Sequence, residues 1–267
     1  MCNYKFNKFS QVLSNEINSN SIENILLARG FLIDIQENEG KKSLFLSDNS
    51  YFDSKANRDY KLRKNDIEFL KEICKKSNSL NVSIIENEHS AVRIDWNGYL
   101  DEKFVNILFD QKSIQIEVSP PYNPSNRFLN HIHSLKVPLS CLEPGVGILI
   151  KSLSAIGIGT WCACDGHGVR EARIDFEGLI QAKWCEKIIK EINKKLNLKM
   201  NWVIENDTLT IKDSGELYDV DYFRELIDVG IELYKFREKY ITMKKQLIQL
   251  IAKIDSDDQI IEKISNL

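Results

Sequence analysis

The segment that decides the fold is residues 159–168, GTWCACDGHG, together with residues 171–178, EARIDFEG, which follow almost at once. In the second segment apolar residues alternate with polar ones, the pattern of a strand with one buried face: Ala172, Ile174 and Phe176. Parallel strands need a crossover of a dozen or more residues, and this connection has no room for one. Gly166 can take the positive φ of a tight turn. The sequence therefore predicts an antiparallel hairpin over residues 160–178.

The segments that flank this hairpin predict helices and a second hairpin. Residues 144–156 carry a helical stripe closed by Gly157, and residues 179–197 show a strong amphipathic pattern. A further hairpin is expected over residues 199–212, and a long helix over about residues 221–252. Helices and strands that alternate without obligatory crossovers are typical of an α+β fold. We therefore expect a mostly antiparallel sheet with flanking helices and a long C-terminal helix.

The first half of the chain predicts a separate α+β part. Ser21 is expected to cap a helix that Gly30 ends, and Asn65 to cap a helix over residues 66–77. Further elements are expected at residues 31–36, 42–47, 80–87 and 91–98 (strands) and 101–110 (a short helix). Three prolines make residues 119–128, SPPYNPSNRF, unsuited to regular structure. We therefore expect an N-terminal part of residues 1–125 and a C-terminal part of residues 126–267.

The composition indicates a globular protein without a general affinity for polyanions. Of the 267 residues, 43% are hydrophobic and 28% are charged, values typical of soluble domains. The net charge of −3 gives no overall attraction to nucleic acid or to acidic membranes. Apolar runs are too short to span a bilayer, and the opening MCNYKFNKFSQ has no signal-peptide pattern. Six cysteines spread along a chain of this length predict reduced thiols, so we expect a cytoplasmic location.

One hypothesis for the turn is a zinc site. Cys162, Cys164 and His167 are ligand types that zinc selects, and residues 162 and 164 share one face of a strand. His131 and His133 also share a face and could complete a set of four ligands. Cys-x-Cys differs from the usual Cys-x-x-Cys spacing, and small buried cysteines explain the same pattern. Zinc is therefore one cofactor that this segment indicates.

A second hypothesis is a catalytic or ligand-binding turn. Its tip is expected to display Asp165, His167 and Arg170 together. An imidazole can generate a thiolate on Cys164, and a neighbouring carboxylate can fix the imidazole tautomer. Cys164, His167 and Asp165 are thus the candidate catalytic residues, and Thr160 and Arg170 are candidate ligand-binding residues. In the structural alternative, Asp165 and His167 only satisfy backbone groups of the turn.

Residues 144–178 resemble a poorly described group of small bacterial and phage proteins. That group shares a helix, a Gly-Ile-x-Thr segment, a Ser-Cys-Asp/Glu-Gly-His turn and a strand that ends in Phe. The matching positions here are Gly157, Ile158, Thr160, Cys164, Asp165, Gly166, His167 and Phe176. Ala163 stands where Ser is usual, which removes any role for that hydroxyl. The strand, turn and strand also resemble the Ser-Cys-Ser-Gly-Arg segment of the wybutosine-synthesis methyltransferase-like family.

A third hypothesis is an S-adenosylmethionine-dependent nucleic-acid methyltransferase. Residues 113–123, SIQIEVSPPYN, resemble the Ser-Pro-Pro-Tyr motif of amino-methyltransferases, which holds a flipped base. Residues 141–153, CLEPGVGILIKSL, resemble a Glu-Pro-x-x-Gly cofactor turn, and Asp165 would then bind ribose. The hairpin prediction contradicts the doubly wound sheet that this fold requires. The simpler interpretation is a proline-kinked loop and a helix start with Pro144 in its first turn.

The chain also permits a function without chemistry at the turn. The long helix predicted over residues 221–252 presents apolar residues at helical spacing. Such a helix packs on its own domain or pairs with a partner protein. The alternative function is therefore an interaction subunit of a bacterial or phage assembly, with a purely structural turn.

Overall fold

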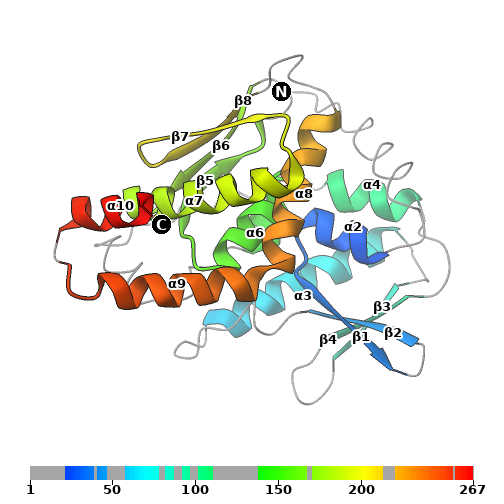
Figure 1. Ribbon diagram of the computed structural model, residues 1–267. Coiled ribbons are helices and arrows are strands. Elements are labelled where there is room, and N and C mark those ends of the chain that lie inside the picture. Colours follow the sequence, from blue (N-terminus) through cyan, green and yellow to red (C-terminus); the bar gives the residue numbers. More distant parts are fainter. Residues whose placement is uncertain are drawn as a thin grey trace. The chain divides into compact units, whose positions relative to one another are not determined.

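The two strands predicted on either side of the Gly166 turn are paired in the structure (Figure 1). β5 (Thr160–Cys164) and β6 (Ala172–Phe176) are antiparallel, with Thr160 opposite Phe176 and Cys164 opposite Arg173. The residues of β6 that the alternation assigns to the core are buried. The predicted pairing of these strands is therefore confirmed.

The computed structural model describes residues 22–38, 41–46, 58–77, 82–86, 92–96, 102–110, 138–166, 170–212, 220–254 and 256–266. The chain divides into two compact units, Met1–Gln115 with Lys136–Lys151, and Ile116–Leu135 with Ser152–Leu267. Each contains helices and an antiparallel sheet, which confirms the α+β prediction. The division differs from the predicted boundary at residue 125, because residues 138–151 group with the first unit. Among the described helices, none has the length and apolar character needed to cross a membrane.

The sheet of the second unit buries one face and leaves the other polar. Its strand order is β5-β6-β8-β7, with β7 (Asn201–Glu205) and β8 (Thr208–Lys212) forming the predicted second hairpin. Ile174 of β6 and Leu209 of β8 are opposite each other on the buried face. The next helix, α7 (Leu179–Leu196), contacts β6 and β7, and α10 (Asp257–Ser265) packs along α7 (Figure 1).

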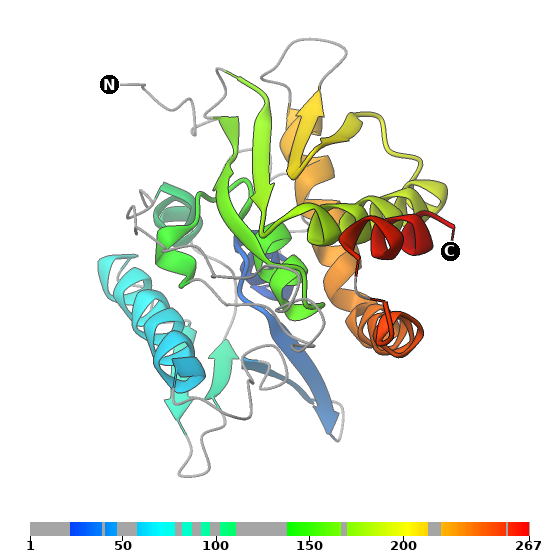
Figure 2. The ribbon, with the colours of Figure 1, turned by 90° about the vertical axis from the view of Figure 1, so that its left-hand side faces the viewer.

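The C-terminal segment is helical as predicted, but it forms two helices. α8 (Val220–Lys235) and α9 (Arg237–Ile251) meet at Phe236, whose ψ is 18°. Because the helical ψ is about −42°, the chain changes direction there, as Figure 2 shows. At the break, Arg237 Nη1 donates to the carbonyl of Tyr234 over 3.1 Å. The apolar spacing continues through the break, so periodicity alone could not reveal it.

The first unit contains a second four-stranded antiparallel sheet. Its order is β1-β2-β4-β3, formed by β1 (Ile33–Asn38), β2 (Lys41–Leu46), β3 (Val82–Glu86) and β4 (Val92–Trp96). Its helices are α2 (Ile22–Arg29), α3 (Arg58–Ser77) and α4 (Glu102–Asp110). α3 begins at Arg58 and not after Asn65, because residues 58–65 contain no Pro or Gly that would end a helix.

Buried charged side chains hold residues 138–142 in the first unit. Arg29 donates from Nε to the Leu108 carbonyl over 3.0 Å and from Nη2 to the Leu142 carbonyl over 3.2 Å. Asp66 accepts the backbone N–H of Leu139 at 2.7 Å and binds Lys151 Nζ at 2.5 Å. Leu139 begins the short 3-10 helix η1 (Leu139–Cys141). The contacts explain why this segment, which was expected in the C-terminal part, groups with the first unit.

A close contact within the second unit fixes the start of β5. The backbone N–H of Glu177 donates to the Gly159 carbonyl over 2.9 Å, and Gln181 Oε1 accepts the Gly159 N–H at 3.2 Å. The buried Glu177 side chain occupies the space that a Cβ at residue 159 would need. Glu177 continues the alternation as a polar residue, but it lies just after β6 and is buried.

We predict that breaking the buried pair of the first unit is costly. Asp66→Asn and Lys151→Met should each lower the free energy of unfolding by about 3–5 kcal/mol, because each removes one charge of the buried ion pair. The double variant should lose clearly less than the sum, as measured by urea unfolding in a double-mutant cycle. Additive losses would show that the two side chains do not stabilise each other.

We also predict that Gly159→Ala destabilises the second unit by about 1–3 kcal/mol, because the added methyl group overlaps Glu177. In a Glu177→Ala background the same substitution should cost much less, since the space is then open. Thermal unfolding of the four proteins measures this coupling. An equal cost in both backgrounds would contradict the contact.

Candidate functional site

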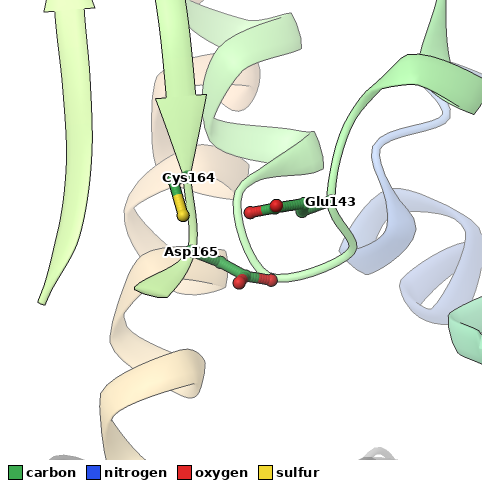
Figure 3. A group of neighbouring side chains, drawn as sticks. All are labelled: Glu143, Cys164 and Asp165. Atoms are coloured by element: carbon green, nitrogen blue, oxygen red, sulfur yellow. The ribbon is translucent and has the colours of Figure 1, made fainter. Parts of the chain in front are cut away.

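Three predicted site residues lie on β5, the edge strand of the sheet in the second unit. Cys162 is exposed and opposite Asp175, whereas Thr160 and Cys164 are half-buried. Figure 3 shows the side chains of Cys164, the last residue of β5, and of Asp165, which follows it. Glu143, also labelled in Figure 3, belongs to the first unit, where its carbonyl accepts the N–H of Val146.

The sulfur of Cys164 receives two hydrogen bonds from the far side of the turn. The backbone N–H of Gly166 donates to Cys164 Sγ over 3.3 Å, and Arg170 Nη2 donates to the same sulfur over 3.3 Å. Arg170 is held in this place by its own backbone N–H, which donates to the Gly166 carbonyl over 3.1 Å. The structure therefore brings together Cys164 and Arg170, which the sequence had assigned to separate roles.

Gly166 has the positive φ that the sequence predicted. Its φ is 82°, a conformation that residues with a Cβ rarely adopt. A Cβ there would also lie 3.1 Å from the backbone of Glu171. Only glycine fits this close approach without strain, and the approach brings the Gly166 N–H to the sulfur.

Asp165 does not lie on an exposed tip. Its side chain is fully buried, with 0% of its surface exposed, although the sequence predicted that the turn would display it with Arg170. A buried carboxylate forms hydrogen bonds within the protein, which suits a positioning role better than contact with a solvent-borne ligand. His167, the third predicted catalytic residue, lies outside the described residues.

Of the three ligands in the zinc hypothesis, Cys162, Cys164 and His167, the structure describes the two cysteines. Cys162 and Cys164 occupy alternate positions of β5, opposite Asp175 and Arg173 of one neighbouring strand. Among the described residues of the second unit taken alone, no three ligand atoms of His, Cys, Asp or Glu lie close enough to share an ion. His131, His133 and His167 lie outside the described residues, so zinc binding stays a prediction.

Polar side chains next to the thiols form a network that the local sequence pattern does not predict. Arg173 Nε donates to Asp175 Oδ1 over 2.8 Å, and the Thr208 hydroxyl donates to the same oxygen over 2.8 Å. Thr208 of β8 is opposite Asp175 of β6. The alternation of β6 identified Arg173 and Asp175 as surface residues, but only the pairing with β8 brings Thr208 beside them.

The remaining described cysteines are poor nucleophiles. Burial raises the pKa of the Cys74 thiol to about 11, and it also raises the pKa of the fully buried Cys185. For Cys141, burial again raises the pKa, and a hydrogen bond with Ser140 opposes the rise. All five described cysteines are free thiols. At neutral pH these three thiols are almost entirely protonated, which makes them internal standards for thiol reactivity.

A cavity of about 700 Å³ lies elsewhere in the second unit. It is lined by α7, α9 and α10, through residues such as Lys187, Lys194, Met243 and Ile264. None of the predicted site residues lines it. The cavity is therefore a feature distinct from the Cys164 turn.

Most apolar residues of the C-terminal helices α8 and α9 are buried within the second unit. Tyr222, Leu226, Leu233, Leu247 and Ile251 are buried, and the fully buried Lys244 donates to the Gly157 carbonyl over 2.6 Å. Phe236 and Leu250 are exposed. The apolar face that suggested a partner helix is thus largely occupied, and a protein partner for residues 221–252 stays a prediction.

The structure describes one of the two segments that resemble a methyltransferase. The Ser-Pro-Pro-Tyr segment lies outside the described residues. Residues 144–146 form a turn before α6 (Gly147–Ala155), so Pro144 precedes the helix and does not lie in its first turn, where the simpler interpretation expected it. The sheet that contains β5 is antiparallel, whereas a doubly wound fold binds its cofactor on parallel strands. The buried Asp165 is also poorly placed to bind ribose.

Comparisons with protein-family models, with curated proteins and with solved structures find no match to this chain.

Proposed function

We propose that this protein is a thiol-dependent enzyme in which Cys164 is the nucleophile. The observation that supports the proposal is the pair of donors on its sulfur, from Gly166 and Arg170. A thiolate is the reactive form of cysteine, and donors aimed at the sulfur stabilise its negative charge. The guanidinium keeps its charge at all physiological pH values, so the donor is always present.

The neighbouring residues have supporting roles in this proposal. Arg170 contacts the thiolate and an incoming ligand. Thr160, on the same strand as Cys164, is a second residue that contacts the ligand. Asp165 positions the turn from its buried place. His167 is the proposed general base, two residues beyond Asp165 in the turn. Zinc held by Cys162, Cys164 and His167 is the competing proposal, and metal analysis of the purified protein decides between them.

The test is selective alkylation. Full-length protein carrying Cys2→Ser is treated with iodoacetamide at pH 7, and each thiol is followed by peptide mass spectrometry. Cys164 should react about tenfold faster than the exposed Cys162, because only Cys164 receives the two donors. Cys74 and Cys185 should react far more slowly, because burial raises the pKa of both thiols.

Arginine variants provide the matched control. Arg170→Met should slow alkylation of Cys164 about 2- to 5-fold, the size expected for an exposed charged contact. Arg173→Met removes a neighbouring arginine that binds Asp175 and not the sulfur, so it should leave the rate unchanged. Equal rates for Cys162 and Cys164 in the parent protein would rule the proposal out.

A further inference from the structure

We infer that the thiol site takes phosphate monoesters and accepts their phosphoryl group on Cys164. This inference rests on the proposed function, because it needs a nucleophilic Cys164. It adds the substrate class, which follows from the donors that surround the sulfur. Both donors, the Gly166 N–H and the Arg170 guanidinium, lie 3.3 Å from Sγ. A group bonded to the sulfur therefore presents its oxygens within reach of the same two donors.

The chemistry of these donors favours a tetrahedral oxyanion. A guanidinium offers parallel N–H groups that match two phosphate oxygens, together with a permanent positive charge. Backbone N–H groups in a turn with a positive-φ glycine form an anion-binding concavity. Gly166 has this conformation, with φ of 82°. A neutral carbonyl substrate would use the N–H but would gain much less from the charge of Arg170.

Two carboxylates of the second unit bear on the charge that an anion would meet. One is the buried Asp165, which has a carboxylate oxygen within 4.8 Å of Cys164 Sγ, so the charge of Arg170 has to offset it. Asp175, the carboxylate opposite Cys162, accepts hydrogen bonds from both Arg173 and Thr208. Its negative charge is thus compensated by the arginine on its own strand. Because Arg173 is paired with Asp175, the two residues add no net charge next to Cys164, and the positive charge that contacts the sulfur is that of Arg170.

The reaction has two balanced steps. In the first, the Cys164 thiolate donates an electron pair to phosphorus, the bond from phosphorus to the ester oxygen breaks, and the alkoxide or aryloxide leaves with that pair. In the second, water attacks the phosphorus of S-phosphocysteine, the sulfur–phosphorus bond breaks, and its electrons return to the thiolate. The water oxygen ends in inorganic phosphate, and its proton passes to the alkoxide or aryloxide through solvent. No oxidant or metal takes part in either step.

The first experiment measures binding by protection. The alkylation of Cys164 is repeated with inorganic phosphate or orthovanadate present. Either anion should slow Cys164 about tenfold at saturation and leave Cys162 unchanged, because only Cys164 lies beside both donors. Arg170→Lys, which keeps the charge but loses the fork, should weaken the protection, and Arg173→Lys should not. Equal protection of both cysteines would overturn the inference.

The second experiment measures turnover. The protein is given p-nitrophenyl phosphate, and S-phosphocysteine is trapped by rapid quench and located by mass spectrometry at Cys164. Cys164→Ser should abolish both signals, while Cys162→Ser should retain them, and far-UV circular dichroism checks that each variant is folded. Turnover of p-nitrophenyl acetate without turnover of the phosphate would assign the site to acyl transfer and overturn the inference.

The failures of the two proposals are distinguishable. If Cys164 is alkylated no faster than Cys162, the nucleophilic thiol itself is refuted. If Cys164 is alkylated rapidly but phosphate gives neither protection nor a trapped intermediate, the thiol proposal stands and only the phosphoryl substrate is refuted.

Discussion

The antiparallel register between β5 and β6 is the constraint on which the second unit depends. It sets Thr160 opposite Phe176 and Cys164 opposite Arg173, which fixes the face that each cysteine occupies. Because β5 ends at Cys164 and β6 begins at Ala172, the chain must return within a short connection. The hydrogen bond from Arg170 to Gly166 closes that connection and brings the guanidinium to the sulfur. The site is thus a direct consequence of the strand pairing.

The first unit depends on a different kind of interaction. Arg29, Asp66 and Lys151 are buried charges, and each is compensated by hydrogen bonds or by an opposite charge. A buried pair often adds little stability compared with an apolar packing, but losing one partner leaves an uncompensated charge. Buried charges of this kind favour one packing of the segment, because any other packing would separate them from the groups they bind. Here they hold the segment that begins at Leu139 against α3.

Some features of the site could be predicted from the sequence and others could not. The positive φ of Gly166 could be predicted from the Cys-Asp-Gly segment, since glycine in a tight turn commonly adopts it. The Arg170 contact accompanies a hydrogen bond from its N–H to the Gly166 carbonyl, four residues earlier, which the alternation pattern does not predict. The burial of Asp165 is non-local, because turn residues are usually exposed and tertiary packing covers this one.

The sequence by itself determined the α+β class, the antiparallel hairpins and the buried face of β6, because period-two alternation and short connections act over a few residues. Tertiary structure decided the break at Phe236 and the placement of residues 138–151 in the first unit. The placement of residues 138–151 depends on the contacts of Arg29 with Leu142 and of Asp66 with Lys151, whose partners lie more than eighty residues apart. Apolar periodicity records which face of an element is buried. Apolar periodicity does not indicate which distant side chain packs against that face, and such a contact determines to which unit a segment belongs.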